Sequence, residues 1–361
     1  MDMTASGLSR RHLGVAAAAF VGLSVRPGSA ADCGLLPGTP VSWIVPFTAG
    51  GGSDVYSRLI EPFLERHLGR QVAVGNVTGA GGVVGSKAIR DAAPDGATIG
   101  IVDAGGLMVG RLSEGNKVPS PTRDFTVLGR IARMRVAWII RADSPVRTMD
   151  DLATGAAAGK LVIGVTDIGS PAFVSAAITA EILGLSVEFV AGYGGSADSA
   201  LALMRGDVDL ISAGFESMRE SLETGELRAI LQVSDVPIED HASLAGVALL
   251  AGPEGYAKRR ATAIGRDPES ADASARQVIE VTGAGRVVMA PADLPAPVAT
   301  CLREALMEAL TDPEFTAAAA RARRSLDVAS GVEALALLEQ VESHAADLAP
   351  MMKAAAGKVR E

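Results

Sequence analysis

The stretch Val41-Ser-Trp-Ile-Val-Pro-Phe-Thr-Ala-Gly-Gly-Gly-Ser-Asp54 decides the fold class. Its first five residues are β-branched, aromatic or small and end at a proline, which predicts a buried strand. A glycine-rich loop follows, and from Val55 apolar residues recur at helical spacing behind a candidate N-cap, Asp54 or Ser53. A buried strand that leads into a glycine loop and then a helix is typical of α/β proteins with a largely parallel sheet.

The same order of elements recurs along the chain. A second predicted strand at 71–74 is followed by the glycine loop 78–85, a helix, and a third strand at 98–102. A further α/β unit occupies roughly 134–234 and contains a third glycine loop at 192–196. Two such α/β units agree with the two domains expected for a chain of this length.

The last third of the chain gives a weaker pattern. Residues 252–285 are polar and are expected to form loops around short helices, whereas apolar periodicity predicts helices at 298–310, 317–324 and 332–349.

Composition excludes several classes of protein. The chain has 361 residues, 48% hydrophobic and 21% charged, which is globular rather than disordered. The formal charge of −9, the absence of a basic block and an aromatic content of only 4% argue against a nucleic-acid partner.

The N-terminus has the pattern of an export signal. Ser9-Arg10-Arg11 precedes an apolar run at 13–25, and small residues reach Ala31, so we expect a signal peptide at 1–31. The run is too short to span a bilayer, which needs roughly 20 residues. The paired arginines favour a twin-arginine signal over an ordinary Sec signal, and both remain open. We therefore expect a periplasmic protein that is soluble after cleavage.

Two cysteines, Cys33 and Cys301, are too few for a disulfide scaffold, and their spacing matches no zinc or redox motif. An oxidising periplasm would permit a bridge between them. Two free thiols are the alternative.

The glycine loops are candidate anion sites. Amides at a helix N-terminus lack intrahelical partners and carry partial positive charge, and glycine lets a ligand approach them. Tight turns that need glycine for positive φ are the alternative. Because two such loops occur in adjacent units, we favour anion binding.

Catalytic patterns are weak. Gly79-Ala-Gly81 continues to Gly85 and gives GxGxxxG, an imperfect dinucleotide fingerprint. His67, His241 and His344 have no metal-binding spacing, and neither GxSxG nor SxxK occurs. We expect no metal, no cofactor and no enzyme activity.

Several motifs, taken together, resemble one family. The opening stretch is similar to the VPFxxGGxxD-type start of the tripartite tricarboxylate transporter solute-binding family, the TctC or Bug proteins. The resemblance continues, in order, through Gly79-Ala-Gly-Gly82, Ala92-Ala-Pro-Asp-Gly96, Gly194-Gly-Ser-Ala197, Gly206-Asp-Val-Asp209 and Thr224-Gly-Glu-Leu-Arg-Ala229. It covers about 41–233 well and the C-terminal helices loosely.

The resemblance implies a type II periplasmic-binding-protein-like fold, in which two Rossmann-like lobes enclose a ligand cleft. Lobe one would comprise 32–133 and 235–361, and lobe two 134–234. Transferred by position, neutral donors rather than Arg or Lys would hold a small carboxylate. The implied ligand-binding residues are Phe47, Thr48, Gly50, Gly51, Gly52, Ser53, Gly81, Gly82, Asp103, Thr166, Gly169, Ser170, Tyr193, Gly195, Ser196 and Ser212.

The chain also departs from the family pattern. The lobe-two loop after 165 lacks a histidine, Gly194 replaces a lysine, and Ser212-Ala-Gly214 replaces FDN. Asp103 stands where a small hydroxyl residue is usual. It is expected either to cap a helix or to contact a cationic or hydroxyl group of the ligand.

The resemblance implies a monomeric solute-binding protein that delivers a small carboxylate to membrane permease subunits. A ligand sensor of the same fold is the alternative, and an exported α/β enzyme is a third reading.

Overall fold

The computed structural model describes residues 33, 39–166, 170–238 and 241–360. The predicted export signal at 1–31 and the predicted site residue Gly169 lie outside the described residues.

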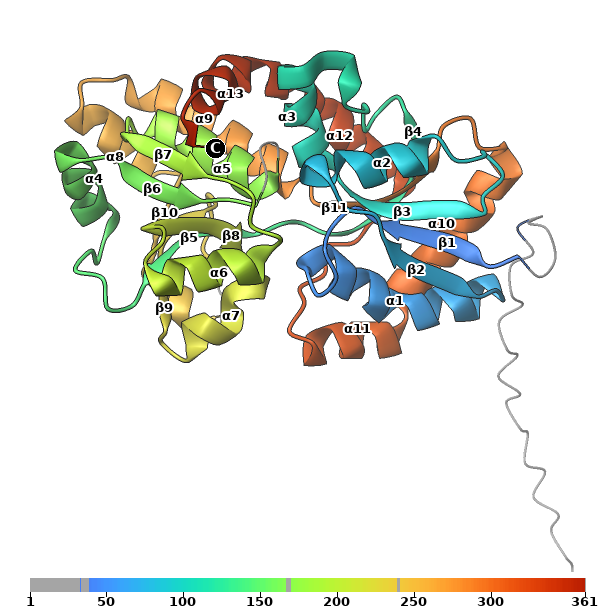
Figure 1. Ribbon diagram of the computed structural model, residues 1–361. Helices are drawn as coiled ribbons and strands as arrows, with labels where there is room; N and C mark the ends of the chain where they lie inside the picture. The colour runs from blue at the N-terminus through green and yellow to red at the C-terminus, as the bar shows by residue number, and fades with distance from the viewer. Residues whose placement is uncertain (1–32, 34–38, 167–169, 239–240, 361) are drawn as a thin grey trace, which may run out of the picture.

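Two sheets, each flanked by helices, form two α/β lobes side by side (Figure 1). The first lobe is the six-stranded sheet and its helices, and the second lobe is the seven-stranded sheet and its helices. The first sheet runs β12 (Ala329–Ser330), β4 (Phe125–Ala132), β11 (Arg286–Pro291), β3 (Thr98–Asp103), β1 (Val41–Val45) and β2 (Val72–Asn76). The second runs β10 (Ala248–Leu249), β9 (Leu227–Val233), β5 (Val136–Arg141), β8 (Leu210–Gly214), β6 (Leu161–Gly164), β7 (Val187–Val190) and β13 (Val359–Arg360).

The prediction of a largely parallel sheet holds for the second sheet, but three of the five strand pairs in the first sheet are antiparallel. Over both sheets, six of the eleven described neighbouring pairs are parallel. The exceptions are β11, which is antiparallel to β3 and β4, the β12–β4 pair, and β5, which is antiparallel to β8 and β9. The two-lobed α/β architecture predicted from the sequence is thus confirmed.

The helices up to α7 alternate with one or two strands, and the later ones occur in consecutive pairs. They are α1 (Gly52–Leu68), α2 (Val83–Arg90), α3 (Ala104–Glu114), α4 (Met149–Ala158), α5 (Pro171–Ile182), α6 (Ser196–Arg205), α7 (Phe215–Glu223), α8 (Tyr256–Ala263), α9 (Pro268–Gly283), α10 (Ala296–Thr311), α11 (Pro313–Arg321), α12 (Gly331–Ala345) and α13 (Ala349–Ala356). None of the described helices is long and apolar enough to cross a membrane.

The region 252–285 differs from its expected loop-like character. It contains α8 and the 16-residue α9, which begins behind the N-cap Asp267. Most of its polar residues are exposed or half-buried, although Asp272 and Thr282 are buried. Ala275, Val278 and Val281 are buried in the core. The strand β11 that follows was not predicted at all.

The strand pairing departs from the expected division into lobes at two places. Both β10 and β13 lie within 235–361, which was assigned to lobe one, yet they pair with β9 and β7 of the second sheet. Short edge strands of two residues carry no periodicity, so only the tertiary pairing reveals where they belong.

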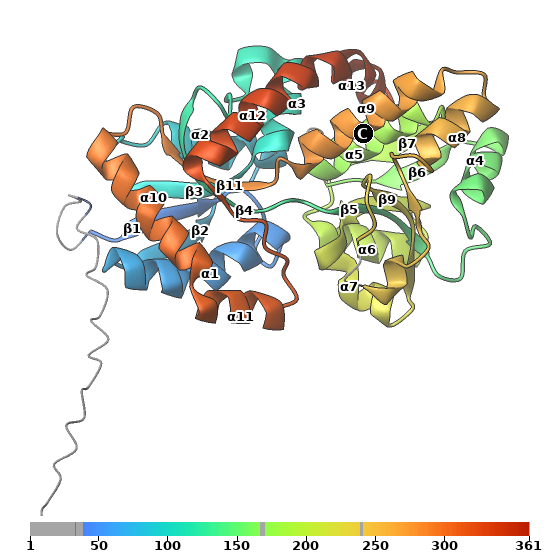
Figure 2. The same ribbon diagram turned by 180° about the vertical axis from the view of Figure 1, so that it is seen from behind.

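Helices α3, α9, α12 and α13 join the two lobes along one side of the molecule (Figure 2). One apolar cluster runs through this side and includes Leu107, Phe173, Val281 and Met352 from these helices and α5. A second cluster packs α1 and α10 on the first sheet, and a third packs α6 and α7 on the second. The lobes therefore share a continuous core on one side and face each other across a cavity elsewhere.

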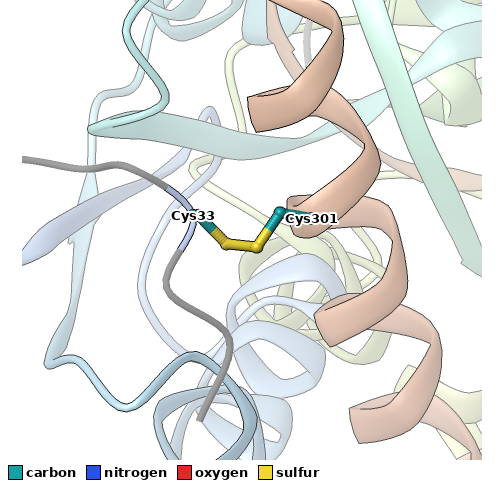
Figure 3. Close-up of a disulfide and its surroundings, with 2 residues drawn as sticks. All are labelled: Cys33 and Cys301. Atoms are coloured by element: carbon teal, nitrogen blue, oxygen red, sulfur yellow. A yellow bond between two sulfur atoms is a disulfide. The ribbon is translucent and has the colours of Figure 1, made fainter.

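A disulfide joins Cys33 to Cys301 on α10 (Figure 3). Their Cα atoms are 5.3 Å apart, within the usual range for a bridge, and 268 positions separate them in sequence. The sequence left a disulfide and two free thiols open, and the structure contains the disulfide. It ties the start of the described chain to the core of the first lobe, where Cys33 is buried.

Candidate functional site

A cavity of about 130 Å³ lies between the two lobes. Its volume is roughly tenfold what a single water molecule needs, which is about 10–15 Å³. The walls come from loops at the carboxyl ends of strands, the usual place for ligands in α/β sheets. The lining residues are Pro46, Phe47, Thr48, Gly51, Gly52, Ser53, Thr78, Gly79, Gly81, Gly82, Asp103, Met134, Val136, Thr166, Ser170, Pro171, Ala172, Gly194, Gly195, Ser196, Ala213, Gly214, Ser217 and Arg286.

The first glycine loop is held in shape by Asp54. Its carboxylate accepts hydrogen bonds from the Gly50 amide at 2.8 Å, from Asn76 Nδ2 at 2.9 Å and from Arg58. Burial alone would raise the pKa of Asp54, but these hydrogen bonds lower it overall, so the loop is organised around an ionised carboxylate. Asn76 also donates to the Phe47 carbonyl at 2.9 Å. Asp54 thus holds the conformation of the first glycine loop through these hydrogen bonds.

The second glycine loop packs against the first. Gly79, Gly81 and Gly82 all have positive φ, as the turn alternative required. A Cβ at Gly82 would lie 2.9 Å from the Phe47 ring, so glycine permits the two loops to touch. The turn and anion-site interpretations are therefore compatible, because these glycines both shape the turn and line the cavity.

The second lobe supplies hydroxyl groups and another helix start. Ser170 is the N-cap of α5, and its Oγ accepts a hydrogen bond from the Phe173 amide at 3.2 Å. Gly195 and Ser196 begin α6 directly opposite the first loop. A Cβ at Gly195 would lie 2.9 Å from Thr48 Oγ1, so the two lobes are in close contact at this point.

Arg286 is the functional candidate that the sequence reasoning missed. This first residue of β11 lines the cavity and is only 4% exposed. Its Nε and Nη1 have no hydrogen-bond partner in the described part of the chain, and its guanidinium lies 4.8 Å from the centre of the Tyr56 ring. The expectation that only neutral donors receive the anion is thus incomplete, because a buried cation faces the same cavity.

Asp103 is the other charged residue among those described as lining the cavity. Its Oδ1 accepts a hydrogen bond from the Gly106 amide at 2.8 Å, which caps α3. Burial raises the pKa of Asp103 to about 6, against the opposing effects of that hydrogen bond and of the Arg286 charge. The capping role expected as one alternative is therefore present, and its Oδ2 is left without a partner.

Polar contacts cross between the lobes beside the cavity. Glu216 on α7 accepts a hydrogen bond from Ser325 Oγ at 2.7 Å, and Arg323 pairs with Glu223. Arg324 lies in the chain between Arg323 and Ser325. Together with Gly50 it lines an adjoining cavity of about 250 Å³. Burial lowers the pKa of Arg324, although its guanidinium keeps its charge at neutral pH. This edge of the cleft is therefore closed by hydrogen bonds and ion pairs.

The structure brings most of the predicted site residues together. The predicted residues that line the cavity are Phe47, Thr48, Gly51, Gly52, Ser53, Gly81, Gly82, Asp103, Thr166, Ser170, Gly195 and Ser196. Three others do not line it. Gly50 lines the adjoining cavity instead, the Tyr193 ring packs beside Gly164, and Ser212 is buried within β8.

Within the described residues, no group of three or more His, Cys, Asp and Glu side chains could hold a metal ion.

Two α/β lobes that enclose a cavity between strand ends have the architecture of periplasmic binding proteins, and solved structures share it. The chain matches a structure described as periplasmic binding protein BugD with a TM-score of 0.68, 22% identity and coverage of 90% of this chain and 100% of that one. It also matches R. palustris Rpa4515 with adipate, with a TM-score of 0.67, 24% identity and coverage of 89% and 98%.

Residues 57–242 match the family model of the tripartite tricarboxylate transporter family receptor, TctC. The chain is 31% identical over 233 residues to a UPF0065 protein in the gbd 5' region of Cupriavidus necator, covering 62% of this chain and 69% of that protein. It is 29% identical over 225 residues to a UPF0065 protein in the tcbD-tcbE intergenic region of Pseudomonas sp. (strain P51). That match covers 59% of this chain and 66% of the relative's length, just under two thirds. The chain therefore belongs to the TctC receptor family.

Proposed function

We propose that this protein is a periplasmic solute-binding receptor. It captures a small organic carboxylate between its lobes and delivers it to the membrane permease subunits of a tripartite tricarboxylate-type transporter. It binds the acid without converting it.

The observation that carries the proposal is the Arg286 guanidinium, buried beside a cavity with two nitrogens unpartnered. Leaving a charged donor buried and unpaired costs several kcal/mol. A ligand anion in the cavity would supply the missing acceptor.

The loops around the cavity support an anion as well. The first turn of α1 begins at Gly52, and that of α5 follows Ser170, so helix N-termini from both lobes reach the cavity. In α1 the Gly52 and Ser53 amides lack intrahelical acceptors. In α5 the first residue, Pro171, has no N–H, and the Phe173 amide already donates to Ser170 Oγ. Ala172 therefore supplies the free amide there. Free amides at helix N-termini favour negative charge. Family membership and the adipate bound to the R. palustris relative favour a carboxylate over other anions.

A thermal-shift screen of the purified protein against aliphatic and aromatic mono-, di- and tricarboxylates tests the proposal. A ligand present at 100 times its Kd adds about 2.7 kcal/mol to the free energy of unfolding. We expect a clear rise in Tm with one chemical class and recovery of that acid unchanged after incubation. No shift with any acid, or consumption of the acid, would overturn the proposal.

A further inference from the structure

Asp103 presents a second unsatisfied group to the same cavity. The side chain is 5% exposed, and its Oδ2 has no hydrogen-bond partner within the described residues. The role of Asp103 as the N-cap of α3 uses Oδ1 only. A capping aspartate on the surface, such as Asp267, offers its second oxygen to water, whereas the second oxygen of Asp103 is buried without a partner in the wall of the cavity. Capping of α3 therefore accounts for Oδ1 of Asp103 but not for Oδ2.

Asp103 and Arg286 occupy directly opposed positions on β3 and β11. Side chains at such positions share one face of the sheet, with Cβ atoms roughly 4.5–5.5 Å apart. The guanidinium of Arg286 lies over the Tyr56 ring, and a Cβ at Gly52 would lie 2.7 Å from its Nη2. No ion pair joins the two residues among those described, so neither neutralises the other and both keep unpartnered polar atoms.

These two side chains are the only charged ones among the described lining residues, so the cavity has no net formal charge when both are ionised. Burial raises the pKa of Asp103 to about 6, against the opposing effects of the Gly106 amide and the Arg286 charge, so the carboxylate is mostly ionised at neutral pH. A simple carboxylate at Arg286 would then lie near a second, unpaired carboxylate, which is unfavourable in a buried site. A ligand that also donates a hydrogen bond would satisfy both residues.

The geometry points to Asp103 as the residue that selects acids with a hydroxyl or ammonium donor close to the carboxylate. This inference rests on the proposed function and deepens it: Arg286 receives the anion, and Asp103 Oδ2 accepts from the neighbouring donor. Asp103 would discriminate between acids because an acid without the donor leaves Oδ2 buried with no hydrogen-bond partner.

The test is calorimetric titration with matched acids that differ only in the donor. The sets are succinate, malate and aspartate; glutarate, 2-hydroxyglutarate and glutamate; and benzoate, 2-hydroxybenzoate and 2-aminobenzoate. For the set that binds, we expect a donor-bearing acid to bind at least 10-fold more tightly than the unsubstituted one. Comparing the hydroxyl with the amino member identifies the donor.

Asp103→Ser provides the matched variant, because serine is also a good N-cap but carries no carboxylate. We expect the affinity ratio within the set to fall to near 1 in this variant. Asp267→Ser makes the same change at an exposed N-cap and should preserve the ratio. General damage to the fold would weaken all members of a set alike, so the ratio isolates the role of Asp103.

Two results would overturn the inference. If acids bind but the unsubstituted member binds as tightly as the others, Asp103 does not select and the proposed function stands. If no acid binds, either in these sets or in the wider carboxylate screen, the proposed function fails, and the inference fails with it.

Discussion

Asp103 and Arg286 stand directly opposite each other on antiparallel strands, yet no ion pair joins their side chains in the described structure. Each is buried, lines the cavity between the lobes and keeps unpartnered polar atoms. Two opposite charges so placed would ordinarily neutralise each other. Because no ion pair joins them, the wall of the cavity carries an unpartnered donor and an unpartnered acceptor.

Replacing Gly52 should reduce affinity while leaving the fold intact. A Cβ at this position would lie 2.7 Å from Arg286 Nη2 and displace the guanidinium. We expect Gly52→Ala to weaken binding of the cognate acid roughly 10-fold or more, since hydrogen bonds to charged groups contribute about 1.5–3 kcal/mol. Because the end of a flexible side chain can move, stability should change by less than about 1 kcal/mol.

Calorimetry and thermal unfolding check this prediction, with Gly75→Ala as the control. Gly75 lies on β2, and a Cβ there would meet no atom within 4 Å. Equal ligand affinities of the Gly52→Ala and Gly75→Ala variants would show that Gly52 does not contribute to the binding site.

The approach of Gly195 to Thr48 predicts energetic coupling between the lobes. Gly195→Ala would place a Cβ 2.9 Å from Thr48 Oγ1 and hold the lobes apart. We expect roughly 10-fold weaker binding, partly restored when Thr48→Ala removes the hydroxyl from the same protein. The measurement is a double-mutant cycle on affinity. Strictly additive effects would show that this contact is not made in the bound state.

The stability of the ligand-free protein should depend on Asp103 in a defined pH range. Its pKa is raised to about 6 in the folded state, compared with an ordinary value of 3.8. The folded state therefore binds more protons between these values, and the contribution of Asp103 to stability is lost as pH rises through about 6. Asp103→Asn, which keeps a capping side chain, should be more stable than the parent at pH 7.5 by roughly 1–3 kcal/mol.

Chemical denaturation at pH 4.5 and pH 7.5 measures this difference, which should shrink at the lower pH. Asp267→Asn, at an exposed N-cap, serves as the control. A difference for Asp103→Asn that stays constant across this range would rule out a raised pKa.

The Cys33–Cys301 bridge should stabilise the fold without affecting ligand binding. It closes a very long loop, and removing such a bridge costs about 2–5 kcal/mol. We expect the double variant Cys33→Ser, Cys301→Ser to unfold at lower denaturant while its affinity stays within twofold, because neither cysteine lines the cavity. An unchanged denaturation midpoint would mean that the bridge contributes little.

Local signals explain what the sequence revealed about the site. The strand β1, the loop after it and the start of α1 carry apolar, glycine and N-cap signals within a few residues of one another. Each signal reports backbone conformation at its own position. The loops that supply cavity amides were therefore predictable.

The parts that were missed depend on contacts remote in sequence. Arg286 reaches the cavity because β11 inserts between β3 and β4, more than 150 positions earlier in the chain. The run Val287-Val-Met-Ala290 could have suggested a short buried strand, but no local pattern places it in the first sheet. Ser212 shows the same limit: it is buried in β8, whereas its neighbours Ala213 and Gly214 line the cavity.

The most direct test of the central claim compares affinity for the cognate acid in the parent, Arg286→Gln and the control Arg260→Gln. Arg260 is half-buried and donates to the Leu183 carbonyl, and it does not line the cavity. Removing one partner of a buried charge pair costs about 2–5 kcal/mol, so Arg286→Gln should bind at least about 30-fold more weakly. Its ligand-free stability should equal or exceed that of the parent, because an unpaired buried cation is lost. An affinity within threefold of the parent would contradict the claim that Arg286 holds the ligand anion.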